Sequence, residues 1–114
     1  MNIVKEARNL AIEMSKKYGK VPPFDHTELV VNKGQELAKK LNADIKIVTV
    51  SCYLIDVGLS KAHQEGKIKE HVRFSCEIAK DFLKKFNLYE KDKEKIINCI
   101  EASSWRDKAY LHRK

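Results

Sequence analysis

Apolar residues recur every three to four positions along most of the chain, which is the period of amphipathic helices. This period predicts an all-α fold, a single compact bundle of about five helices. The predicted helices run from about Asn2 to Tyr18, from Asp25 to about Leu41, from near Asp44 to Gly58, from His71 to Phe86, and from about Asp92 to Ser103. Residues 59–70 are mostly polar, and we expect them to form a loop.

The second predicted helix begins with a capping-box pattern. Asp25 is expected to accept hydrogen bonds from backbone amides, while Glu28 reaches back towards the start of the helix. The side chains expected to face inward are Leu29, Val30, Leu37, Ala38 and Leu41.

The third predicted helix is apolar nearly all the way round, in the segment IKIVTVSCYLIDVG, which is typical of a central helix packed on several sides. Asp56 falls in its last turn, before the expected stop at Gly58. A carboxylate there faces the negative end of the helix dipole and a surrounding of low dielectric constant. Its charge needs compensation, by a metal ion, by a protonated histidine, or by an ion pair with Lys61 or Arg73.

Two histidines stand at predicted helix starts, His26 on the second helix and His71 on the fourth. Helix ends in a bundle often converge on one pocket, and histidine with carboxylate suits Zn, Mn, Fe or similar ions. His63 and His112 are interpreted as surface residues.

Charge and composition narrow the function classes. The net charge of +7 comes mainly from lysines interleaved with acidic residues, which is typical of a solvated surface, and aromatic residues suited to base stacking are not interleaved with them. No apolar run reaches the roughly 18 residues of a membrane helix, and the N-terminus lacks a signal-peptide core, so we expect a cytoplasmic protein. Cys52, Cys76 and Cys99 form no CxxC pair and are expected to be buried free thiols.

The order of these segments resembles the HD superfamily of metal-dependent phosphohydrolases. The resemblance spans about Phe24 to Ala102, through FDHTELVVNKGQELAKKLNAD, IVTVSCYLIDVGLS, HVRFSCEIAKDFLKKFNL and KIINCIEASS. Family members show a histidine opening the second helix, a His-Asp pair in an "LLHDIG"-like segment, a later "H..SA.IA..FL" helix and a distant aspartate.

The resemblance implies an all-α domain over residues 1–114 that binds a divalent transition metal (Mn, Fe, Ni or Zn) and hydrolyses phosphate esters, often in nucleotides. By this resemblance His26 and Asp56 are metal ligands, and Asp56 and His71 are the catalytic candidates. Lys61 and Arg73 are the candidates for holding a substrate phosphate.

The chain also departs from the family pattern. Ile55 stands where relatives have the histidine of the His-Asp pair, and Ser103 stands where many carry another histidine. Asp107 is too near the fifth helix to serve as the distant aspartate. The first hypothesis is therefore a degenerate HD domain that binds a ligand or partner without catalysis. The alternatives are an active phosphohydrolase and a basic helical domain that binds nucleic acid.

Association with a second copy is a further expectation. Relatives carry one or two more helices over the bundle, so we expect an apolar face around Ile96, Ile100 and Trp105 that a homodimer would cover.

Overall fold

The computed structural model describes residues 2–19 and 23–112, with side-chain surroundings up to Ser103, and in this part of the chain every regular element is helical. The elements are α1 (Ile3–Lys17), α2 (Phe24–Lys40), α3 (Ile45–Leu54), α4 (Leu59–Gln64), the 3-10 helix η1 (Ile68–Glu70), α5 (His71–Leu83) and α6 (Glu90–His112). The prediction of an all-α fold is confirmed. None of the helices in the described ranges is long and apolar enough to cross a membrane.

The starts of α1 and α3 follow from local capping. The side chain of Asn2 accepts a hydrogen bond from the amide of Lys5 at 3.2 Å, and that of Asp44 accepts one from the amide of Ile47 at 3.1 Å. Each cap satisfies a backbone amide that has no partner within its helix. The predicted starts of both helices are confirmed.

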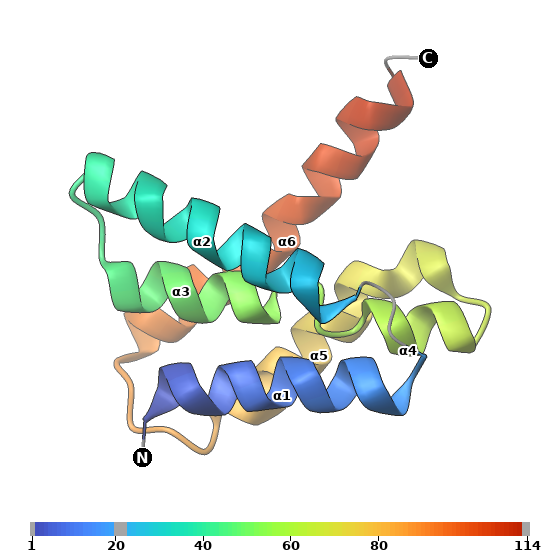
Figure 1. The fold of residues 1–114 in the computed structure, drawn as a ribbon, viewed down its shortest axis with the longest axis horizontal. Helices are drawn as coiled ribbons and strands as arrows, with labels where there is room; N and C mark the ends of the chain where they lie inside the picture. Colours follow the sequence, from blue (N-terminus) through green and yellow to red (C-terminus); the bar gives the residue numbers. More distant parts are fainter. Residues whose placement is uncertain (1, 20–22, 113–114) are drawn as a thin grey trace.

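Helix α3 is the centre of the molecule. It packs against α1, α2 and α6, and Figure 1 shows it in green between α2 and α1. Val50 and Leu54 on this helix are completely buried. The prediction of a central helix packed on several sides is therefore confirmed, although α3 ends at Leu54 and Gly58 is not its terminator.

The predicted inward face of helix α2 is correct at Ala38 and wrong at the three leucines. Leu29 and Leu37 are each 56% exposed and Leu41 is 69% exposed, whereas Val31 and Ala38 are buried. The reason lies at Gly34, where an added Cβ would lie only 2.6 Å from Sγ of Cys52 on α3. This close approach of the two helices requires small residues between them, so the leucines are left on the outside.

The predicted capping box of α2 is also wrong. The helix begins after Pro23 without a side-chain cap, and Asp25 lies inside its first turn. Glu28 instead accepts hydrogen bonds from Arg8 of α1 and from the Tyr53 hydroxyl of α3, each at 3.1 Å. These bonds fasten α2 to its two neighbours.

Residues 59–70 are not a loop, because α4 and η1 occupy most of this segment. Helix α5 begins at His71 as predicted and ends three residues early, at Leu83, while α6 is longer than predicted and its far half extends away from the other helices (Figure 1). Ile96 and Ile100 are completely buried, so the prediction of an uncovered apolar face at these two residues is wrong. The side chain of Trp105, the third residue of that predicted face, lies outside the described residues.

The three thiols are free but not all buried. Cys76 is buried, Cys52 is partly buried, and Cys99 is exposed, which corrects the expectation for Cys99. His63 is exposed, as expected, and the side chain of His112 lies outside the described residues.

Candidate functional site

A tight corner at residues 55–58 joins α3 to α4 and sets the position of Asp56. The amide of Gly58 donates a hydrogen bond to the hydroxyl of Ser75 on α5 at 2.9 Å, and Ser75 is completely buried. A Cβ added at Gly58 would lie 2.5 Å from the backbone nitrogen of Ser75 and 2.6 Å from the carbonyl carbon of Phe74. Only glycine therefore allows the corner to rest directly on the backbone of α5.

Asp56 lines a cavity of about 10 Å³, close to the space that one water needs. Its Oδ1 atom is shielded from solvent. The side chains that share the cavity come from α1, α2, α3, α4 and the corner: Ala11, Met14, Ser15, Thr27, Tyr53, Val57 and Ser60. Four of them carry hydroxyl groups: Ser15, Thr27, Ser60 and Tyr53. The first three can hydrogen-bond a carboxylate in the cavity, whereas the Tyr53 hydroxyl donates to Glu28. The surroundings of Asp56 are thus a small hydroxyl-lined cavity.

The other predicted site residues near Asp56, the metal ligand His26 and the catalytic candidate His71, do not line this cavity. His26 is exposed, and the residue of α2 that lines the cavity is the next one, Thr27. His71, at the first position of α5, is half-buried with its Nδ1 atom shielded from solvent, and it does not line the cavity either. Across the described residues, no group of three or more histidine, cysteine, aspartate or glutamate side chains is arranged to hold a metal ion. The side chains that line the Asp56 cavity thus include no imidazole and no second carboxylate.

Lys61 and Arg73, the predicted phosphate-binding residues, do lie together, around a second cavity of about 230 Å³. Its other lining residues are Lys67, Phe74, Glu77 and Ile78. Lys61 Nζ lies 5.6 Å and Arg73 Cζ lies 4.9 Å from the centre of the Phe74 ring, within the range of cation–π attraction. Ser60 lines the first cavity and Lys61 the second, so two consecutive residues of α4 serve different cavities.

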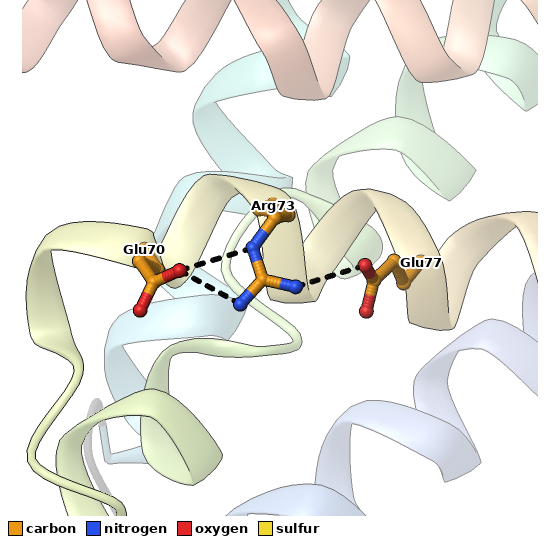
Figure 2. Close-up of polar contacts among 3 residues, drawn as sticks. All are labelled: Glu70, Arg73 and Glu77. Atoms are coloured by element: carbon orange, nitrogen blue, oxygen red, sulfur yellow. Dashed lines mark hydrogen bonds and ion pairs between the residues drawn. The ribbon is translucent and has the colours of Figure 1, made fainter.

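Figure 2 shows how Arg73 is held in place by two carboxylates of its own segment. Its guanidinium donates to Glu70 at 2.8 and 3.2 Å and to Glu77 at 3.0 Å. The hydrogen bond to Glu70, assisted by its charge, raises the pKa of Arg73 above the usual arginine value. The carboxylates that Arg73 pairs with are therefore these two, and three of its five N–H groups are used in these bonds.

A third group of residues ties α1, α2 and α3 together beside the Asp56 cavity. The rings of Phe24 and Tyr53 stack with their centres 6.5 Å apart, and Arg8 Cζ lies 5.2 Å from the Phe24 centre. Burial, followed by the hydrogen bond to Glu28, raises the pKa of the Tyr53 hydroxyl. No sequence motif links these residues, because the contacts join positions on three helices.

Comparison with known families agrees with this architecture. The HD-domain family model matches residues 24–108, most of the chain, so the chain belongs to the HD-domain family, a group of metal-dependent phosphohydrolase-like proteins. The resemblance expected from the sequence over residues 24–102 is thereby confirmed. No curated protein and no solved structure matches the chain.

Proposed function

We propose that this HD domain binds a phosphate-containing small molecule without hydrolysing it. The observation that carries the non-catalytic part is the composition of the Asp56 cavity. The family aspartate is surrounded by hydroxyl and apolar side chains, and the cavity has no second carboxylate or imidazole in its lining. Catalytic metal sites normally use three or more protein ligands and leave one position open for water.

The size of the cavity supports the same conclusion. The space beside Asp56 is about 10 Å³, which holds no more than one water and is too small for a phosphate-containing molecule. Ile55, which the resemblance places at the position of the family histidine, has no side-chain donor atom for a metal. In this proposal the polar groups at the corner serve the packing of α1, α3 and α4.

The ligand-binding part of the proposal rests on the second cavity. Lys61, Lys67 and Arg73 line a space of about 230 Å³ together with one carboxylate, Glu77, so the side chains that line it carry a net positive charge. Arg73 is already oriented by its carboxylate partners, so little side-chain entropy is lost when it binds an anion. The two N–H groups outside these bonds can donate to phosphate oxygens.

Metal analysis tests the non-catalytic assignment. Protein purified without chelator is expected to contain well below one equivalent of Mn, Fe, Ni or Zn, and an Asp56→Ala control is expected to give the same result. About one equivalent in the parent protein that is lost in Asp56→Ala would contradict the proposal and favour an active phosphohydrolase. An Ile55→His variant is expected to gain no metal affinity, because His26 is exposed and does not line the cavity.

Calorimetry with inorganic phosphate and a nucleoside monophosphate tests the ligand. We expect binding that Lys61→Ala and Lys67→Ala each weaken about tenfold, as expected for the loss of one charge-assisted hydrogen bond. Lys46→Ala is the matched control, since Lys46 is exposed at the start of α3 and does not line this cavity. Equal weakening by all three variants, or no binding at all, would contradict the assignment of this cavity. Binding of a polynucleotide that falls steeply with salt would favour the nucleic-acid alternative instead.

A further inference from the structure

The outer side of α2 carries a row of large apolar side chains that are exposed to solvent. Leu29, Leu37 and Leu41 are 56, 56 and 69% exposed, and Ile45, the first residue of α3, is 40% exposed. Single exposed apolar residues are common, but a contiguous group of large ones marks an interaction surface. The inner side of the same helix is already used, because Val31 and Ala38 are buried there. Helix α2 therefore has apolar residues on two sides.

The spacing of these residues defines one ridge. Leu29, Lys33, Leu37 and Leu41 follow one another at intervals of four, which places them along a single inclined row on a helix surface. Rows of this kind pack against one another in the commonest class of helix pair in globular proteins. A convex ridge suits another helix better than a small molecule, because small-molecule sites are concave.

We propose that this ridge is the interface of a homodimer, in which α2 of one copy packs against α2 of a second copy across a two-fold axis. A two-fold interface must be complementary to itself, since each copy presents the same surface. An antiparallel alignment of the two ridges meets this condition. It places Leu29 of one copy beside Leu41 of the other, and it centres the contact between Lys33 and Leu37.

The charges next to the ridge fit the same arrangement. Lys33 stands in the middle of the ridge and Glu36 on the neighbouring row, and both are exposed. The antiparallel alignment brings Lys33 of one copy towards Glu36 of the other, twice per dimer. This self-complementarity of charge points to a second copy of the chain rather than to an unrelated protein. The interface expected from the sequence on α6 is replaced by one on α2, because Ile96 and Ile100 are buried.

The size of the surface predicts how strong the association is. The 17 residues of α2 make a helix about 25 Å long. One helix pair of this length buries less than the roughly 800 Å² per partner of a standard stable interface. The dimer is therefore weak and its population depends on protein concentration. The inference does not depend on whether the domain is catalytic or what it binds at the second cavity.

Sedimentation velocity from low micromolar to near-millimolar protein tests the proposal. The weight-average mass is expected to rise from 13.2 kDa towards twice that value. Leu37→Lys and Leu41→Lys are each expected to weaken dimerisation at least tenfold. Ile68→Lys is the matched control, because Ile68 is 43% exposed on η1, which packs against α4 and α5, and its replacement should leave dimerisation unchanged. Circular dichroism verifies that each variant is folded.

A charge exchange tests the antiparallel alignment and uses only exposed positions, so it remains informative if a leucine variant fails to fold. Lys33→Glu is expected to weaken the dimer, and the double variant Lys33→Glu/Glu36→Lys is expected to restore it. A mass of 13.2 kDa at every concentration would overturn the proposal and leave the ridge to a different protein. A dimer that neither the leucine variants nor Lys33→Glu weaken would overturn it equally.

Discussion

Folded proteins usually bury apolar groups and expose charged ones. The corner at residues 55–58 shields a charged group from solvent, whereas the outer side of α2 exposes apolar groups. At the corner, a carboxylate oxygen of Asp56 is shielded from solvent in a cavity of about 10 Å³. On α2, three leucines are more than half exposed. Both arrangements cost free energy in an isolated chain, since buried polar groups need hydrogen-bond partners and exposed apolar groups need cover.

The two regions differ in where the compensation comes from. The Asp56 cavity is lined by hydroxyls of its own chain, from Ser15, Thr27 and Ser60, and the corner is fixed by the contact of Gly58 with Ser75. The α2 ridge faces solvent. A buried polar group that the fold accommodates internally explains how the domain is held together, whereas an exposed apolar ridge points to another molecule. The following predictions test this difference.

Gly58→Ala is expected to have the largest effect. Its Cβ would overlap the backbone of α5 at Phe74 and Ser75, and backbone cannot move aside as a side chain can, so we expect a loss of about 3 kcal/mol in the free energy of unfolding. Urea denaturation measures it. Gly66→Ala is the control: Gly66 has a φ of +70° but open space around it, so about 1 kcal/mol is expected. A loss at Gly58 no larger than that at Gly66 would contradict the tight corner.

Asp56→Leu is expected to have the second largest effect. Leucine leaves the hydroxyls of the small cavity facing a side chain that forms no hydrogen bond, at a cost of about 2 kcal/mol. Asp56→Asn keeps the shape and one acceptor oxygen, so its cost should be below about 1 kcal/mol. Urea denaturation of both variants measures the difference. If Asp56→Leu were more stable than the parent protein, the hydroxyls would have no part in accommodating Asp56.

The dependence of stability on alkaline pH tests the contact between the inner side of α2 and Cys52 of α3. Burial, with a smaller contribution from Cys99, raises the pKa of the Cys52 thiol from 9.0 to about 11. The unfolded chain therefore loses this proton at lower pH than the folded chain does. The stability from this group is complete below pH 9 and is lost as the pH rises towards 11. We expect the Tm to fall over this range and Cys52→Ala to reduce the fall. An unchanged fall would mean that other groups cause it.

Some parts of the fold were predictable because they depend on neighbouring residues. The starts of α1 and α3 depend on the caps Asn2 and Asp44, a few residues from the amides they bind. Helix α4 was missed because its six residues lie in a polar segment and it is held by packing against α5, which no local pattern reports. The face of α2 was predicted wrongly because Gly34, rather than the leucines, decides how closely α2 approaches α3.

The candidate site also has one part that the sequence predicts and another that depends on contacts between helices. That Asp56 lies in a shielded environment follows from the apolar segment around it and from the helix that precedes it. The hydroxyls of Ser15, Thr27 and Ser60 could not be assigned to it, because they reach the cavity from three other helices. The positive charges of Lys61 and Arg73 predict an ion pair with Asp56 or a phosphate-binding role. The structure brings them together but around a different cavity, since successive residues of α4 point in different directions.

Leu41→Gln is expected to have the smallest effect. At protein concentrations where the chain is monomeric, the 69% exposed Leu41 has little apolar area to lose, so the free energy of unfolding should change by less than about 0.5 kcal/mol. Val31→Ala, on the inner side of the same helix and 2% exposed, should cost about 2 kcal/mol because it leaves a cavity against the core. Thermal denaturation of both variants at low micromolar protein measures the contrast. Comparable losses would mean that the outer side of α2 is packed within a single chain, and the argument for a second copy would then fail.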